Sequence, residues 1–258
     1  MVLKTVPASA HDAEEIGALM LSVSTSQRLT VEFANCKKQD RQAWTVNSIR
    51  SELAACEACG EDATALKVVE TPPGKKEVIV GFAIWVWSEK AYTSIDCSRA
   101  ANPLPEGIKL TLRQTFRSKM TKMERDHRPK GPCFVLEQLA TAPSHQRRGI
   151  GAGLVRHGLE KADQQCMTCY LSGAPLGVPL YRKLGFEEVG KLEIPLSEFG
   201  GSGTHVHGKS DGWSTTDLGL RSDAVTVAMI RKPKMKTPKL LDARVQMAVH
   251  AAHADDAE

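Results

Sequence analysis

A glycine-rich turn past the middle of the chain constrains its fold most. Residues 146–153 (QRRGIGAG) follow an apolar run over 134–142 and precede a helical pattern over 154–162. A strand that feeds such a turn into a helix points several backbone N–H groups at one place, the positive end of the helix dipole. Glycines let that backbone approach an anion without obstruction from Cβ atoms. The turn therefore predicts a phosphate or pyrophosphate site, to which Arg147 and Arg148 add positive charge.

Two common nucleotide-binding motifs do not fit this turn. The Walker motif ends in Gly-Lys-Ser/Thr, and residues 146–153 contain no lysine. The dinucleotide fingerprint requires G-x-G-x-x-G, whereas this turn reads G-x-G-x-G. The phosphate-bearing ligand must therefore be of another class.

The turn resembles the Q/R-x-x-G-x-G/A motif of the GNAT acyl-CoA-dependent N-acetyltransferases. Residues 180–186 (LYRKLGF) resemble the Y-x-x-x-G-F signature that closes the core of that family, and residues 139–143 (LATAP) precede the turn. The resemblance covers about residues 133–190 and includes features of fungal members. It is fainter at 1–20, 78–88 and 223–233.

Hydrophobic periodicity and turn residues predict a mixed α/β domain. Strands are expected over 2–8, 66–70, 77–87, 134–142, 167–172, 186–194 and 224–231. Helices are expected over 11–23, 38–59, 108–125, 154–162 and 178–183, with 89–107 irregular. The resemblance makes the fold specific: a GNAT-like mixed, mostly antiparallel, splayed sheet of about seven strands flanked by helices.

The 258 residues predict one domain over 1–233 and a flexible C-terminal tail over 234–258. No run of 18 apolar residues occurs, so we expect no membrane span. Seven cysteines and an N-terminus without a signal-peptide pattern predict reduced thiols inside the cell. The location is accordingly expected to be cytoplasmic, with the nucleus left open. The pairs Cys56/Cys59 and Cys166/Cys169 are read as plain thiols, so no metal is expected.

The resemblance implies transfer of an acetyl group from the cosubstrate acetyl-CoA to an amine acceptor. The turn would hold the pyrophosphate, and the backbone just before it would pair with the pantetheine arm like an added strand. The expected cofactor-binding residues are Leu139, Ala140, Thr141, Gln146, Arg147, Arg148, Gly149, Ile150, Gly151 and Ala152.

Two residues are candidates for proton transfer. Tyr181 matches the tyrosine that protonates the CoA thiolate in many family members, and a phenol is protonated at neutral pH. Glu137 is expected to share a strand face with Leu139 and Thr141, and is the candidate base. The alternatives are a packing role for Tyr181 and a structural ion pair for Glu137. A departure from the family pattern is Ala174, where many members carry Asn or Ser.

Other candidates for the chemistry have less support in the sequence. His145, His205 and His207 are alternative bases, and a nucleophilic Cys133 or Cys169 lacks a neighbouring base in the pattern. The polar segment 199–219 is expected to border the acceptor cleft.

Two other functions compete with catalysis by an N-acetyltransferase. One is a GNAT-like acyl-CoA-binding sensor or scaffold with weak turnover. The other is nucleic-acid binding through the basic stretch 109–130. This stretch contains a single aromatic residue, Phe116, which argues against base stacking there. The nature of the acceptor is open, and the protein is expected to be a monomer or homodimer.

Overall fold

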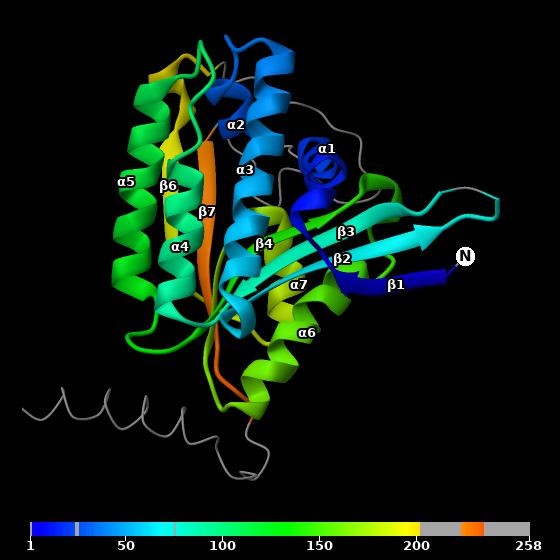
Figure 1. The fold of residues 1–258 in the computed structure, drawn as a ribbon. Helices are drawn as coiled ribbons and strands as arrows, with labels where there is room; N and C mark the ends of the chain where they lie inside the picture. The colour runs from blue at the N-terminus through cyan, green and yellow to red at the C-terminus, as the bar shows by residue number, and fades with distance from the viewer. Residues whose placement is uncertain (1, 24–25, 75, 202–222, 235–258) are drawn as a thin grey trace, which may run out of the picture.

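The computed structural model describes residues 2–23, 26–74, 76–201 and 223–234 (Figure 1). Its strands form one seven-stranded sheet in the order β1-β2-β3-β4-β5-β7-β6. The strands are β1 (Val2–Pro7), β2 (Ala63–Thr71), β3 (Val78–Val86), β4 (Phe134–Thr141), β5 (Cys169–Gly173), β6 (Glu187–Pro195) and β7 (Asp223–Arg231). Every neighbouring pair is antiparallel except β4 and β5. The predicted fold class, a mixed and mostly antiparallel sheet flanked by helices, is confirmed.

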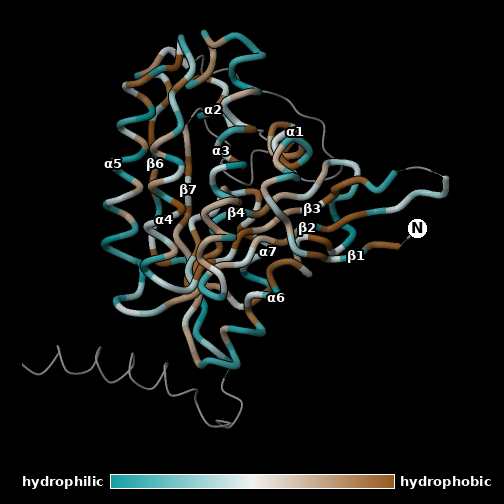
Figure 2. Tube along the Cα trace, viewed as in Figure 1, coloured by the Kyte–Doolittle hydropathy of each residue, from teal (hydrophilic) through white to brown (hydrophobic). Residues whose placement is uncertain are grey.

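Helices cover both faces of this sheet. They are α1 (Ala13–Val23), α2 (Gln27–Glu32), α3 (Lys38–Ala58), α4 (Glu89–Ala100), α5 (Leu110–His127), α6 (Ile150–Gln164) and α7 (Val178–Lys183). Phe82 and Ile84 of β3 pack with α1 and α3, whereas Ala83 and Trp85 pack with α6. Because successive side chains alternate across a strand, α6 lies on the face opposite α1 and α3. Figure 2 shows hydrophobic residues along the strands and hydrophilic ones on the outer turns of α5.

The sheet splits in its middle. The parallel pair β4–β5 is in register only from Phe134 opposite Cys169 to Leu136 opposite Leu171. Beyond Leu136, residues 137–141 of β4 continue along β3 alone within the described structure. The predicted splay is therefore present, and it leaves one edge of β4 open.

The position of α6 depends on a close contact with β3. Trp85 is fully buried, and its Nε1 donates a hydrogen bond to the carbonyl of Leu154 at 3.2 Å. A Cβ atom on Gly158 would lie 2.2 Å from the Trp85 ring, so only glycine fits there. This contact fixes the helix that carries the predicted anion site at its N-terminus.

The expectation that residues 89–107 are irregular is wrong over its first half, which forms α4. Ser88 caps this helix by accepting a hydrogen bond from the Ala91 N–H at 3.1 Å. Only Ala91 and Ile95 are buried, so the helix shows almost no apolar stripe. The short helix α2 was also not predicted.

Parts of two predictions lie outside the described residues. The segment expected to border the acceptor cleft, 199–219, is described only up to residue 201, and the expected tail, 234–258, only at its first residue. Among the helices that the structure describes, none has the length and apolar character needed to cross a membrane.

Candidate active site

The glycine-rich turn has the geometry of an anion site. Helix α6 begins at Ile150, after a left-handed Gly149 with φ 83° and ψ 0°. Arg147 is also left-handed, with φ 64°. Within the described structure, the backbone N–H groups of residues 148–152 have no hydrogen-bond acceptor. These donors lie at the positive end of the helix dipole, where they favour a phosphate group.

The open edge of β4 lies beside this turn. Ala142 N donates to Val80 O at 2.9 Å, so the alternation of an antiparallel ladder directs the backbone of Ala140 toward β3. The backbone groups of Leu139 and Thr141 consequently point toward the gap left by β5. The Thr141 carbonyl already accepts a hydrogen bond from Gln146 Nε2 at 3.3 Å. We expected the backbone of Leu139, Ala140 and Thr141 to be open to a ligand, but the backbone groups of Ala140 point toward β3 instead.

A buried carboxylate fixes the turn to the sheet. Glu70 at the end of β2 is 5% exposed and accepts hydrogen bonds from His145 Nε2 at 2.9 Å and Arg148 Nη2 at 3.1 Å. The hydrogen bond from His145, followed by that from Arg148, lowers the pKa of Glu70. Ser144 Oγ lies 2.8 Å from His145 Nδ1, so both ring nitrogens of His145 have a hydrogen-bond partner. Arg148 is therefore held by a carboxylate as well as placed beside the anion site.

Tyr181 lies where β5 ends. A Cβ atom on Gly173 or Gly177 would come within 2.7 Å of its ring, so both glycines make room for it. Its other neighbour is Phe186, at a ring-centroid distance of 6.0 Å. The Tyr181 hydroxyl has no hydrogen-bond partner among the described residues, and burial raises its pKa to about 12. It is therefore a protonated phenol at neutral pH.

The two recognisable sequence motifs are in contact in the structure. A Cβ atom on Gly151 would lie 3.4 Å from Thr141 Oγ1, 3.5 Å from Leu180 Cδ2 and 4.0 Å from Leu139 Cδ2. Helix α7, which carries Leu180 and Tyr181, thus packs against the start of α6 and the open edge of β4. The glycine-rich turn that has the geometry of an anion site (residues 146–152, the anion turn), the open edge of β4 and the Tyr181 side chain therefore lie in one region.

The prediction that Glu137 shares a face with Leu139 and Thr141 is wrong. The β3–β4 register shifts between Ile84 and Trp85, which pair with Gln138 and Leu136 and leave Glu137 as an extra, bulged residue. Such a bulge inverts the alternation of side chains. Leu139 packs on the α6 side, whereas the Glu137 carboxylate contacts Arg99 of α4. The candidate base therefore lies at the split but on the opposite face from the anion turn.

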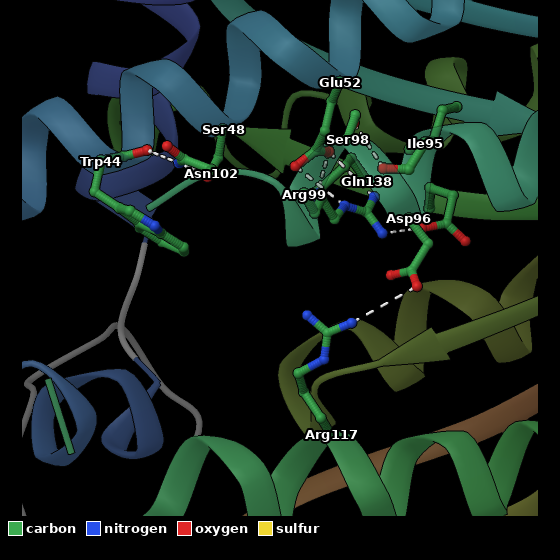
Figure 3. A network of polar contacts seen from close by, with 11 residues as sticks. Trp44, Ser48, Glu52, Ile95, Asp96, Ser98, Arg99, Asn102, Arg117 and Gln138 are labelled. Atoms are coloured by element: carbon green, nitrogen blue, oxygen red, sulfur yellow. Dashed lines mark hydrogen bonds and ion pairs between the residues drawn. The ribbon is translucent and has the colours of Figure 1, made fainter. Parts of the chain in front are cut away.

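Glu137 belongs to a network around Arg99, of which Figure 3 labels Arg99, Glu52 and Gln138. Arg99 Nη1 donates to Glu137 Oε2 at 2.7 Å, and its Nη2 donates to Glu52 Oε2 of α3 at 3.1 Å. Gln138 Nε2 also donates to Glu52 Oε2, at 3.2 Å. Burial lowers the pKa of Arg99, but the nearby carboxylates of Glu52 and Glu137 outweigh it and raise the pKa above its ordinary value. Arg99 of α4 is therefore a permanent cation that binds both α3, through Glu52, and the bulge of β4, through Glu137.

A second, partly buried hydrogen-bonded pair lies near Glu137. Tyr92 of α4 donates its hydroxyl hydrogen bond to Glu124 Oε2 of α5 at 3.0 Å. Burial raises the pKa of Glu124, and the negative charge of Glu137 raises it further. Burial likewise raises the pKa of Tyr92. This side of the split is consequently rich in titratable groups, in contrast to the backbone-lined side.

The alternative catalytic groups fit the geometry less well. Cys133 and Cys169 are 3% and 0% exposed, and burial raises the pKa of each thiol, that of Cys169 to about 12. His145 is committed to Glu70, while His205 and His207 lie outside the described residues. All seven cysteines are unbridged, and no group of potential metal ligands gathers among the described residues. Ala174 begins a short turn before α7 and offers no polar side chain.

Several residues of this region were not predicted, namely Glu52, Glu70, Tyr92, Arg99, Glu124 and Gln138. Glu52 carried a readable signal, because it lies on the apolar stripe formed by Ile49, Leu53 and Cys56 on α3. A carboxylate on such a stripe is rarely buried without a cationic partner. Arg99 carried no such signal, since α4 itself was not predicted.

The structure combines a split α/β sheet with a glycine-rich turn that follows the central strand and has the geometry of an anion site. Residues 120–188 match a family model described as an acetyltransferase (GNAT) domain. That part of the chain is therefore similar to the acetyltransferase domain of the GNAT family.

Individual relatives are distant. An acetyltransferase from the fungus Stachybotrys chartarum is 25% identical over 162 residues, which cover 61% of this chain and 67% of the relative. A solved structure from Corynebacterium glutamicum, described as histone acetyltransferase HPA2 and related acetyltransferase, gives a TM-score of 0.48 at 17% identity, covering 92% of this chain and 99% of that one. The ribosomal-protein-S18-alanine N-acetyltransferase from Escherichia coli gives 0.44 at 14% identity, covering 93% and 99%.

Proposed function

We propose that the protein transfers the acetyl group of acetyl-CoA to a primary amine by direct attack in a ternary complex. One observation carries the proposal: the anion turn, the open edge of β4 and Tyr181 meet where β4 and β5 separate. Each supplies one requirement of acyl transfer from a thioester, namely a phosphate site, a strand edge for an amide-containing arm and a proton donor. The match of residues 120–188 to a GNAT acetyltransferase domain model supports the same chemistry.

The residues present fit acetyl-CoA. The N–H groups of residues 148–152 would bind its pyrophosphate, and the side chains of Gln146, Arg147 and Arg148 border that position. The backbone of Leu139 and Thr141 would pair with the pantetheine arm. Bound there, acetyl-CoA supplies an activated thioester carbonyl.

The chain supplies a proton donor and a proton acceptor on opposite faces of the split. In the overall exchange a C–N bond forms, the C–S bond breaks, and one proton passes from the amine to the thiolate. Tyr181 holds a proton at its phenol oxygen and would deliver it to the departing sulfur. Glu137 would accept the amine proton, directly or through water.

One observation favours a second candidate function. The Glu137 carboxylate is held at 2.7 Å by Arg99, an interaction that competes with its use as a base. A protein with this site that binds acetyl-CoA without turnover would act as an acyl-CoA sensor or scaffold. The two functions share the anion turn and differ only in acceptor chemistry.

Two measurements on the full chain separate these functions. Calorimetric titration with CoA tests the binding site, and release of free thiol from acetyl-CoA with a panel of amines tests transfer. Binding together with amine-dependent thiol release supports the enzyme, whereas binding with no release above the amine-free rate assigns the sensor. Absence of CoA binding contradicts both.

We further propose that residues 1–233 form the catalytic domain and that residues 234–258 are a flexible tail dispensable for it. Within the described residues, Asp163 holds the end of β7 through Arg231 at 2.8 and 2.9 Å, and it accepts the Lys234 N–H at 2.8 Å. We expect a cytoplasmic monomer or homodimer, with a nuclear location open. Truncation after Lys234, followed by gel filtration and the thiol assay, tests this division.

A further inference from the structure

A cavity of about 160 Å³ lies beside the Arg99 network, between α4 with its following loop and α5. Its polar lining comes from Arg99, Asn102, Arg113, Gln114 and Arg117. Its apolar lining includes Leu104 and Leu110, which are 41% and 48% exposed, so the cavity opens to solvent. We propose that this cavity binds the anionic group of the acceptor, and that the acceptor is a short primary amine bearing a carboxylate or phosphate.

The charge of the lining carries the proposal. Among the residues that the structure describes, three guanidinium side chains line the cavity, and no carboxylate does. Each arginine has a carboxylate partner that is absent from the lining: Glu52 and Glu137 for Arg99, Glu32 for Arg113 and Asp96 for Arg117. A guanidinium has five N–H donors, so these pairs leave donors for a further anion.

The arginines are held in different ways. Arg113 is anchored, because its Nη1 donates to the fully buried Glu32 at 2.8 Å and its guanidinium lies 5.0 Å from the Trp44 ring centre. Arg117 is adaptable, because its partner Asp96 is 3.7 Å away and both side chains are about half exposed. Figure 3 shows Arg117 reaching from α5 toward Asp96. A weak surface pair of this kind exchanges readily for a stronger bidentate anion.

Size and position limit the ligand. A volume of about 160 Å³ equals that of roughly five water molecules. It suits one carboxylate or phosphate with a few carbon atoms and is too small to enclose a nucleotide. Arg99 lines the cavity and also binds Glu137, so a single side chain separates the anion from the proposed base. An amine close to the anion would therefore lie near the split between β4 and β5.

This inference rests on the proposed transfer to an amine, but the cavity can be tested separately. The probes are β-alanine and O-phosphoethanolamine, each compared with the analogue that lacks its anionic group, β-alaninamide or ethanolamine, and with spermidine as a polycationic amine. Calorimetric binding in the presence of CoA tests the cavity, and thiol release from acetyl-CoA tests transfer. We expect at least one anionic probe to bind about 10-fold more tightly than the analogue without the anionic group.

Two variants that break the same ion pair give opposite predictions. Arg117→Gln removes a cavity cation and should weaken binding of the anionic probe about 10-fold while leaving binding of the analogue without the anionic group unchanged. Asp96→Asn frees Arg117 for the ligand and should keep or strengthen that binding. Both changes are at exposed positions, so the fold should persist, and a thermal melt checks it.

The possible outcomes separate the two proposals. Anion binding that depends on Arg117, without thiol release, would support the cavity and contradict the transferase. Transfer only to spermidine or to amines without an anionic group, or equal effects of both variants, would overturn the anionic acceptor while the transferase stands. Failure of both anionic probes to bind better than their analogues without the anionic group would also overturn it.

Discussion

The two faces of β4 at the split are built from different materials. On the α6 face, the site consists of backbone N–H groups at residues 148–152, a strand edge and two glycines packed against Tyr181. On the α4 face, it consists of the charged side chains of Glu52, Arg99 and Glu137. A backbone site survives most substitutions that do not fill its space, whereas a side-chain network changes with any one of its members. The first face therefore suits an invariant ligand, and the second suits selection among acceptors.

The largest effect should come from filling the backbone site. In Gly151→Glu, the added Cβ atom would lie 3.4 Å from Thr141 Oγ1, and the carboxylate beyond it would place a bulky anion in the turn. This change should abolish CoA binding, a loss beyond about 100-fold. Gly153→Glu is the matched control, because a Cβ atom at Gly153 would have no atom within 4 Å. The new glutamate adds the same charge to the same helix. Calorimetry on both folded variants decides the matter. Equal losses would show that charge, and not space at the turn, controls binding.

Tyr181 tests whether the α6 face also provides chemistry. Tyr181→Phe keeps the packing against Gly173 and Gly177 but removes the proton, so kcat should fall about 10- to 1,000-fold with little change in CoA affinity. Because burial raises the pKa of Tyr181 to about 12, the wild-type rate should show no alkaline loss from this group below about pH 11. Steady-state kinetics from pH 6 to 10 measure both. Weaker CoA binding with kcat unchanged would make Tyr181 a residue that only positions CoA.

The same contrast explains what the sequence could predict. Residues 146–152 and 180–186 each form one consecutive motif, so their pattern is visible in a single stretch of sequence. All seven strands were predicted within a few residues, because their hydrophobic runs are strong. The Arg99 network was not, since Arg99 is 47 positions from Glu52 and 38 from Glu137. The bulge at Glu137 left no mark in the residue pattern, and the simple alternation rule then assigned its side chain to the wrong face.

The α4 face can be divided with two carboxylates that share Arg99. If Glu137 accepts the amine proton, Glu137→Gln should lower kcat about 10- to 100-fold, because water replaces a general base only in part. Glu52→Gln removes the other partner of Arg99 from a side chain that is 4% exposed and should leave kcat within about threefold. The pH profile of kcat is the deciding measurement, since loss of a base removes its acidic limb. Equal effects of both variants would assign Glu137 to positioning Arg99.

The smallest effect is expected at Glu70, the carboxylate that ties the backbone site to β2. Glu70→Gln weakens the contacts with His145 and Arg148, so CoA affinity should fall about threefold. Because those contacts lower the pKa of Glu70, its contribution to stability is present above the ordinary carboxyl pKa of about 4.3 and is lost as the pH falls through the lower folded value. The melting temperatures of wild type and variant, measured at pH 7 and in steps below pH 5, should thus converge as the pH falls.

Asp126→Asn is the control. The hydrogen bond from Lys122, on the exposed side of α5, lowers the pKa of the Asp126 carboxyl. This variant should therefore show the same loss of its stability difference in acid without any change in CoA affinity. A Glu70→Gln protein that binds CoA as tightly as wild type would show that the turn holds its shape through its backbone alone.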